Sequence, residues 1–206
     1  MAIRNIILDL GGVLLDIDYD KTTTAFEKLG FANFKRMYSQ YSADQLFEKL
    51  ETGMVSEDEF YFILREINNV SEKGITDAWN AMLLNFRTKS FEFINSLRPQ
   101  YKIYLLSNTN AIHKAAFDRI FMETQGKPMD SFFDKAYYSH LAGFRKPNEN
   151  IFEFLCDDAK LSKEESLFID DSINNIETAA KLGFKTHLLK KDETIEKILP
   201  DYLTSS

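Results

Sequence analysis

A short apolar run that ends on an aspartate and a pair of glycines constrains the fold of this chain more than any other segment. Residues 6–8 (Ile-Ile-Leu) are continuously apolar and partly β-branched, which is typical of a strand buried on both faces of a parallel sheet. Asp9 follows at once, and Gly11 and Gly12 permit a turn that residues with a Cβ rarely adopt. Because open parallel sheets bind ligands at the carboxyl ends of their strands, Asp9 is a candidate site residue. Taken alone, the segment fits a surface turn equally well, so the choice depends on the rest of the chain.

The size and charge of the chain limit the classes of function to consider. Its 206 residues fit one large domain or a domain with a modest insertion. Hydrophobic residues make up 44% and charged residues 28%, which are ordinary values for a globular protein with a substantial core. The formal net charge of -7, without any block of lysine and arginine, argues against a nucleic acid as partner.

The cysteine content and the first residues bear on the cellular compartment. Cys156 is the single cysteine, which excludes an intrachain disulfide framework and a cysteine-rich zinc site. Asp9 interrupts the apolar residues that a secretory signal would need, and no apolar run is long enough to span a membrane. We therefore expect a cytoplasmic protein with no membrane partner, either a monomer or a weak dimer.

The chain divides into two kinds of sequence texture. Residues 18–86 are helical in pattern and rich in aromatic side chains, and they predict an inserted all-helical module. Ser56 and Glu59 form a capping box before a helix, and the apolar residues between Trp79 and Phe86 predict a further helix. This inserted segment, 18–86, separates residues 1–17 from residues 87–206.

Helical and strand patterns alternate in the remainder of the chain. Strands are expected at 103–106, 136–138, 166–169 and 186–189, with amphipathic helices between them. Such alternation predicts an α/β domain with a Rossmann-like parallel sheet covered by helices on both faces, and the first strand joins this sheet. The predicted domains are therefore an α/β core of residues 1–17 and 87–206 and a helical cap of residues 18–86.

Polar side chains of distinct kinds follow three of the predicted strands. Asp9 follows the first strand, Ser107 and Asn108 follow a second, Asp170 and Asp171 follow a third, and Lys146 lies in a separate loop. Because parallel strands end at one edge of the sheet, these groups should meet in one crevice. A carboxylate can act as a nucleophile, carboxylates also bind Mg²⁺, and a lysine with a hydroxyl can balance phosphate oxygens. The set suits phosphoryl transfer.

The same residues resemble a known family. Four segments match, in order, the motifs of the haloacid-dehalogenase-like (HAD) superfamily with a helical cap: 9–13 (Asp-Leu-Gly-Gly-Val), 105–108 (Leu-Leu-Ser-Asn), 143–147 (Gly-Phe-Arg-Lys-Pro) and 168–171 (Phe-Ile-Asp-Asp), with Asn175 and Gly183 beyond. Residues 107–110, His113 and 16–18 further resemble the bacterial α-D-glucose-1-phosphate phosphatases of this superfamily.

The resemblance implies a role for each candidate residue. It implies that Asp9 is the nucleophile and a Mg²⁺ ligand, that the Gly11 carbonyl and Asp171 also bind the metal, and that Asp170 lies beside Asp171 as part of the metal site. The residues that it assigns to the substrate phosphate are Gly12, Ser107, Asn108 and Lys146. The expected substrate is a small-molecule phosphomonoester, such as a hexose 1-phosphate, enclosed when the cap closes.

One position departs from the family pattern. Most phosphatases of the superfamily carry a general acid/base aspartate where this chain has Gly11, and losing such a group typically lowers the rate by about 10²–10⁴-fold. Three interpretations stay open: a phosphatase for substrates with good leaving groups, a metal-independent 2-haloacid dehalogenase, and an inactive relative that binds phosphate or a partner. For the first, two roles of Asp16 and Asp18 stay open: partial replacement of the missing acid, or capping of the first helix of the cap.

Overall fold

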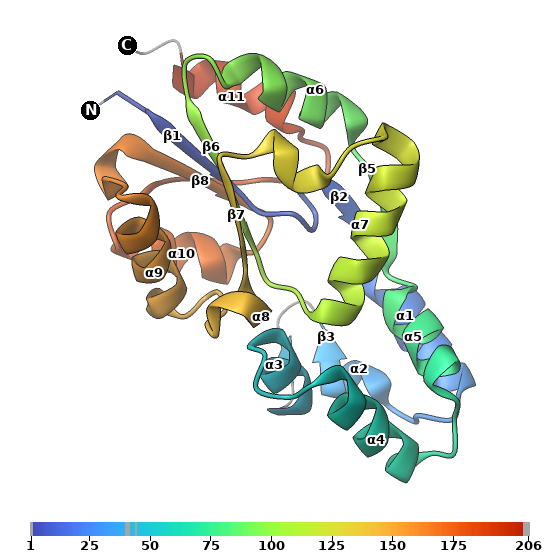
Figure 1. Ribbon diagram of the computed structural model, residues 1–206. Coiled ribbons are helices and arrows are strands. Elements are labelled where there is room, and N and C mark those ends of the chain that lie inside the picture. The colour runs from blue at the N-terminus through green and yellow to red at the C-terminus, as the bar shows by residue number, and fades with distance from the viewer. Residues whose placement is uncertain (1, 40–41, 44, 204–206) are drawn as a thin grey trace.

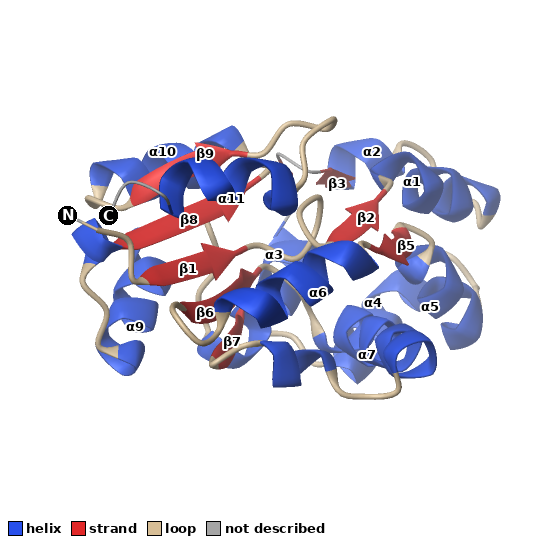
Figure 2. Ribbon diagram, turned by 90° about the horizontal axis from the view of Figure 1, so that it is seen from above, coloured by secondary structure: helices blue, strands red, loops and turns tan. Residues whose placement is uncertain are grey.

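A five-stranded parallel sheet forms the centre of the molecule, in a computed structural model that describes residues 2–39, 42–43 and 45–203. Its strand order is β7-β6-β1-β8-β9 (Figure 2). The strands are β1 (Asn5–Leu8), β6 (Lys102–Ser107), β7 (Lys135–Tyr138), β8 (Ser166–Asp170) and β9 (Lys185–Leu188). Every neighbouring pair is parallel, so the expected α/β architecture is confirmed.

Helices cover both faces of the sheet, and the side-chain alternation along β1 explains why. Ile6 and Leu8 point into one apolar cluster, and Ile7 points into the other. The first cluster includes residues of α6 (Thr88–Leu97), α7 (Ala111–Gln125) and α11 (Ile195–Leu203), and the second includes residues of α9 (Glu149–Ala159) and α10 (Ile173–Lys181). The short elements of this part are η1 (Met129–Phe132), α8 (Ser139–Ala142) and η2 (Lys163–Glu165).

The segment between β1 and α6 forms a cap with an aromatic core of its own. Its elements are α1 (Tyr19–Lys28), α2 (Phe34–Met37), β3 (Tyr38–Ser39), β4 (Ser42–Ala43), α3 (Gln45–Glu51), α4 (Glu57–Ile67) and α5 (Glu72–Asn80). Trp79 is fully buried at its centre, where Phe26, Phe47 and Phe60 pack around it. Ser56 accepts a hydrogen bond from the backbone N–H of Glu59 at 3.2 Å and so caps α4 as expected.

The cap is not wholly helical, which corrects the expectation for residues 79–86. α5 ends at Asn80, and Leu83–Phe86 is a strand, β5, that pairs antiparallel with β2 (Leu15–Ile17). Main-chain bonds at both ends of this ribbon join Asp18 to Met82 and Arg87 to Leu14. Pairing with a distant strand satisfies the backbone here, and this tertiary contact outweighs the helical spacing of the apolar residues. The pair β3–β4 is a second, smaller departure from an all-helical cap.

The two chain crossings between the core and the cap therefore run side by side in one hydrogen-bonded ribbon. Figure 1 shows α1 and α5 leaving this ribbon together, with α3 and α4 farther from it. The ribbon sets the cap over the carboxyl ends of the sheet strands. Within the described residues, no helix has both the length and the apolar character needed to cross a membrane.

Candidate functional site

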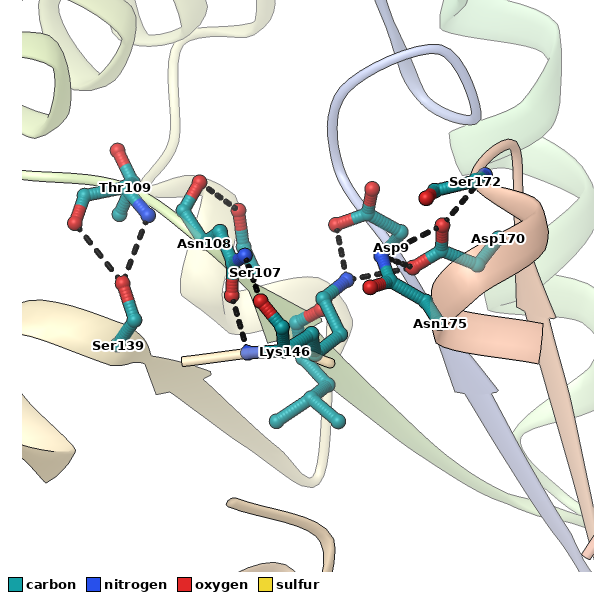
Figure 3. Close-up of polar contacts among 10 residues, drawn as sticks. Asp9, Ser107, Asn108, Thr109, Ser139, Lys146, Asp170, Ser172 and Asn175 are labelled. Atoms are coloured by element: carbon teal, nitrogen blue, oxygen red, sulfur yellow. Dashed lines mark hydrogen bonds and ion pairs between the residues drawn. The ribbon is translucent and has the colours of Figure 1, made fainter. Parts of the chain in front are cut away.

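The register of the sheet brings the acidic residues together. Leu8 pairs with Leu105 on one side and with Ile169 on the other, so β1, β6 and β8 end within two residues of each other at one edge of the sheet. Asp9 and Asp170 consequently emerge side by side at this edge (Figure 3). Asp171 belongs to the same cluster. One carboxylate oxygen from each of the three lies within 4.8 Å of the others.

Lys146 is the buried cation of this cluster. Only 1% of its surface is exposed, and its ammonium group lies 2.8 Å from Asp9 Oδ1 and 2.6 Å from Asp170 Oδ2 (Figure 3). It also donates to the carbonyl of Leu106 at 2.7 Å. Although burial lowers the pKa of Lys146, the charges of Asp170 and Asp9 outweigh burial and raise it, so the side chain carries a positive charge.

Asn108 holds the backbone of Lys146 in place. Its side-chain nitrogen donates to the Lys146 carbonyl, its side-chain oxygen accepts from the Lys146 N–H, and both distances are 2.8 Å. A second pair of hydrogen bonds fixes the loop that carries Asn108. The Ser139 hydroxyl donates to the Thr109 carbonyl and accepts from the Thr109 N–H, each at 2.9 Å. The Asn108 amide therefore positions the lysine.

The carboxylate of Asp170 is fully buried and rich in partners. Besides Lys146, it accepts from the Ser172 N–H at 2.8 Å and from the Asn175 side chain at 3.0 Å to each oxygen (Figure 3). These donors lie on the turn into α10 and on its first residues. Asp170 thus ties Lys146 to the sheet and the following helix.

The electrostatics of the cluster favour a divalent cation. Burial raises the pKa of Asp9 to about 8, with Asp170 and Asp171 adding to the rise and Lys146 opposing it. Burial, followed by the charge of Asp170, raises the pKa of Asp171 to about 6. The raised pKa values show that the single positive charge of Lys146 does not balance three ionised carboxylates, so a further cation would be needed for all three to ionise. Closely spaced oxygen ligands with excess negative charge are the donor set that Mg²⁺ prefers.

Two glycines in the turn after β1 lie against other site residues. Gly12 has a φ of +72°, and a Cβ placed there would lie 2.2 Å from Asp171 Oδ2. A Cβ on Gly11 would lie 2.3 Å from the Cδ1 of Ile17. The Ile17 side chain therefore occupies the space into which a side chain at position 11 would project. Position 11 thus carries no acidic side chain, and the side chain next to it, that of Ile17, is apolar.

A cavity of about 160 Å³ lies between this cluster and the cap. The predicted residues that line it are Asp9, Gly11, Ser107, Asn108, Lys146 and Asp171. Asp170 and Gly12 adjoin the lining through Lys146 and Asp171, respectively. Six of the eight residues expected to meet thus line one cavity, and the other two lie directly behind its lining.

Asp16 and Asp18 lie outside this cavity. Asp16 pairs with Arg87 at 2.8 Å in the β2–β5 region, and the Asp18 side chain accepts from the Asp20 N–H at the start of α1. These contacts favour the capping and structural interpretation of both residues. His113, in contrast, lines the cavity, and its ring is held by contacts of Nε2 with the Trp79 carbonyl at 3.1 Å and of Nδ1 with the Asn110 side-chain nitrogen at 3.2 Å.

Three cap residues that the motifs do not point to also line the cavity. Tyr19, Tyr38 and Glu51 form its wall on the cap side, opposite the acidic cluster. Arg145, next to Lys146 in sequence, contacts Glu51 across the boundary between the core and the cap. A charged residue in an amphipathic helix usually faces solvent, so sequence pattern gives no signal for Glu51.

Comparison with known proteins identifies the family. The family sequence model of the haloacid dehalogenase-like hydrolases matches residues 3–183 of this chain. The chain belongs to this family. It is 36% identical over 186 residues to the D-ribitol-5-phosphate phosphatase of Bacteroides thetaiotaomicron, which covers 89% of this chain and 90% of that protein.

Solved structures of the family share the whole fold. A mutant HAD family enzyme from Bacteroides thetaiotaomicron, in complex with magnesium and inorganic phosphate, has a TM-score of 0.91 at 32% identity, covering 96% of this chain and 99% of that chain. A HAD-like hydrolase from Porphyromonas gingivalis has a TM-score of 0.91 at 36% identity and covers both chains completely. The HAD-like core expected from the motifs is therefore confirmed.

Proposed function

We propose that this chain is a Mg²⁺-dependent phosphomonoester hydrolase that acts on a small phosphorylated sugar or polyol. The observation that carries the proposal is the meeting of Asp9, Asp171 and the buried Lys146 at one cavity. A metal-independent dehalogenase would gain nothing from three clustered carboxylates, because the one positive charge of Lys146 leaves part of their mutual repulsion unbalanced. The phosphatase activity and the bound magnesium and phosphate of similar proteins support the same conclusion.

Asp9 is the proposed nucleophile. One of its carboxylate oxygens attacks phosphorus in line with the ester oxygen, the bond between phosphorus and the ester oxygen breaks, the alcohol leaves with a proton taken from water, and an aspartyl-phosphate forms. Water then hydrolyses the aspartyl-phosphate, which releases inorganic phosphate and restores Asp9. Lys146 is adjacent to Asp9 at 2.8 Å and stabilises negative charge on the phosphoryl group. The Ser107 hydroxyl lines the same cavity and supplies a further donor.

Asp9, Asp171 and the Gly11 carbonyl are the proposed metal ligands. Bound Mg²⁺ would neutralise the phosphate and polarise its bonds. Asp170 contributes charge to this group while its oxygens hold Lys146, Ser172 and Asn175. Gly12 lets the backbone pass close to Asp171 and the phosphate site, where a side chain would collide with the carboxylate.

Two sugar-like substrates are candidates for this site. The sequence resemblance favours a hexose 1-phosphate, whose leaving group needs little help from an acid, and this fits a glycine at position 11. The Bacteroides relative instead suggests D-ribitol 5-phosphate. Either molecule is small and polar. The cytoplasmic location and the oligomeric state, a monomer or a weak dimer, remain predictions from the sequence.

A phosphatase panel tests the proposal. D-ribitol 5-phosphate, glucose 1-phosphate, glucose 6-phosphate and p-nitrophenyl phosphate are offered with and without Mg²⁺, and released phosphate is measured. We expect Mg²⁺-dependent turnover that Asp9→Asn abolishes. Metal-independent halide release from a 2-haloacid would establish dehalogenase chemistry instead. A folded protein that is inactive on every substrate would support the inactive relative.

A further inference from the structure

Glu51 is a cap carboxylate buried in the wall of the cavity. It is the last residue of α3, and its side chain is 4% exposed. The Tyr38 hydroxyl donates to its Oε1 at 2.9 Å, and Arg145 Nε lies 2.8 Å from its Oε2. Arg145 comes from the loop of the core that carries Lys146. This contact therefore joins the cap to the core beside the phosphate site.

The contact leaves hydrogen-bonding capacity unused. Although Arg145 Nε and Glu51 Oε2 are close enough to attract each other, neither atom makes a hydrogen bond among the residues that the structure describes. Both atoms are buried. Buried polar atoms without hydrogen bonds are rare in native proteins, and each one is unfavourable by itself. Both residues also line the cavity, so a ligand there lies against this imperfectly aligned pair and can bond to the two side chains.

The charges of this pair indicate the chemistry of that ligand. Glu51 and Arg145 carry opposite charges that cancel, so a substrate end with a net charge would leave one of them unbalanced. A hydroxyl group both donates and accepts a hydrogen bond, and it carries no charge. A neutral polyhydroxyl chain can therefore accept from Arg145 and donate to Glu51.

Tyr19 lines the same cavity as this pair and the acidic cluster. Burial, followed by the charges of Asp171 and Glu51, raises the pKa of Tyr19 well above its usual range, so its hydroxyl remains a donor. Its ring centroid is 5.9 Å from that of Tyr38. The cavity thus has a phosphate end at Asp9 and Lys146 and a hydroxyl-binding wall at Tyr19, Glu51 and Arg145.

We propose that Glu51 and Arg145 determine substrate specificity by binding the hydroxyl groups of a sugar or polyol phosphate, with Tyr38 holding Glu51 in place. This inference rests on the phosphatase function proposed above. It assigns recognition of the organic part of the substrate to one residue of the cap and one of the core. Recognition would then require both parts of the molecule to be in contact.

The test compares two substrates that differ only in their hydroxyl groups. D-Ribitol 5-phosphate and n-pentyl phosphate have the same carbon chain length and similar alkoxide leaving groups, and the second lacks the free hydroxyls. The quantity measured is the ratio of kcat/KM for the first to kcat/KM for the second. We expect Glu51→Gln and Arg145→Gln each to lower this ratio about tenfold or more, the effect of losing a hydrogen bond to a charged group.

Glu48→Gln is the matched control. Glu48 lies on the same helix, half exposed, with its Oε1 3.9 Å from Arg145 Nη1. We expect this variant to leave the ratio unchanged. Thermal unfolding establishes that each variant is folded. If Glu51→Gln does not fold, Tyr38→Phe removes only the hydroxyl that holds Glu51, and a lowered ratio is expected there too.

The outcomes separate this inference from the proposed function. Turnover of both substrates with a ratio that stays the same in the Glu51 and Arg145 variants would overturn the inference and leave the phosphatase function intact. An equal loss on both substrates would also overturn it, because it would show that the pair only positions the cap. Absence of Mg²⁺-dependent turnover of any phosphomonoester by the unmodified chain would overturn both.

Discussion

At the scale of single residues, the contact between Gly12 and Asp171 makes a sharp prediction. A Cβ at Gly12 would lie 2.2 Å from the Asp171 carboxylate, and the φ of +72° strains any residue except glycine. We expect Gly12→Ala to displace Asp171 and to weaken Mg²⁺ binding at least tenfold, with a loss of about 1–3 kcal/mol in the free energy of unfolding. Mg²⁺ titration and chemical denaturation measure these two effects.

Gly143→Ala is the control that separates backbone strain from the steric contact with Asp171. Gly143 has a similar φ of +77°, but no atom lies within 4 Å of where its Cβ would be. This variant should lose stability through strain while retaining Mg²⁺ affinity. Equal effects of both substitutions on Mg²⁺ binding would contradict the account of Gly12.

The burial of Lys146 gives a second prediction at this scale. Lys146→Met leaves Asp9 and Asp170 without their shared cation in a buried place, and breaking a buried ion pair typically lowers the free energy of unfolding by about 3–5 kcal/mol. Lys135→Met is the control, because Lys135 contacts Asp158 at the same 2.6 Å as Lys146 contacts Asp170 but at the exposed surface. Denaturant unfolding at pH 7 should show a large loss for the first variant and little change for the second.

At the scale of elements, a network between α5 and α7 joins the cap to the core. Asn110 caps α7, accepts from the Trp79 indole at 3.3 Å and from the His113 N–H at 3.0 Å, and leaves its side-chain nitrogen facing His113 Nδ1. The His113 ring stacks on Trp79 with ring centroids 4.6 Å apart. A neutral imidazole fits these partners, since Nε2 donates to the Trp79 carbonyl and Nδ1 accepts. A second proton on the ring would face another donor.

This network predicts a loss of stability in acid. Burial lowers the pKa of His113 to about 4, whereas the unfolded chain titrates near 6.5. Between these values the unfolded state binds more protons, so stability falls as the pH falls from about 6.5 towards 4. Between pH 7 and pH 5 we expect His113 to account for about 2 kcal/mol of lost unfolding free energy.

Denaturant unfolding of the unmodified chain and of His113→Gln at pH 7 and pH 5 measures this contribution. Glutamine does not titrate, so the acid-dependent loss should be smaller in the variant by the stated amount. The same pH dependence in both proteins would show that His113 is not the group responsible.

The ribbon of β2 and β5 shows where sequence reasoning reaches its limit. The strand ends at Asp9, Ser107 and Asp170 follow from sequence alone, because a buried apolar run and the polar residue after it are adjacent in the chain. Residues 83–86 carry apolar side chains whose spacing also fits a helix, and only pairing with residues 15–17 makes them a strand. Neither segment contains a sequence pattern that identifies the other as its pairing partner.

At the scale of the whole molecule, the site is assembled from a core that the motifs reveal and a cap that they do not. The convergence of Asp9, Lys146 and Asp171 could be predicted because parallel strands end at one edge. The pairing of Glu51 with Arg145 could not, because it depends on how the cap docks onto the core. The residues that would choose the substrate therefore lie where sequence pattern is least informative.

The central claim is that the carboxylates at this edge of the sheet bind one divalent cation, and calorimetric titration with Mg²⁺ tests it most directly. We predict one ion bound per chain, with affinity reduced at least tenfold in Asp9→Asn and in Asp171→Asn and unchanged in Glu48→Gln. Folded proteins that bind Mg²⁺ equally well in all four forms, or an unmodified chain that binds none, would contradict the claim.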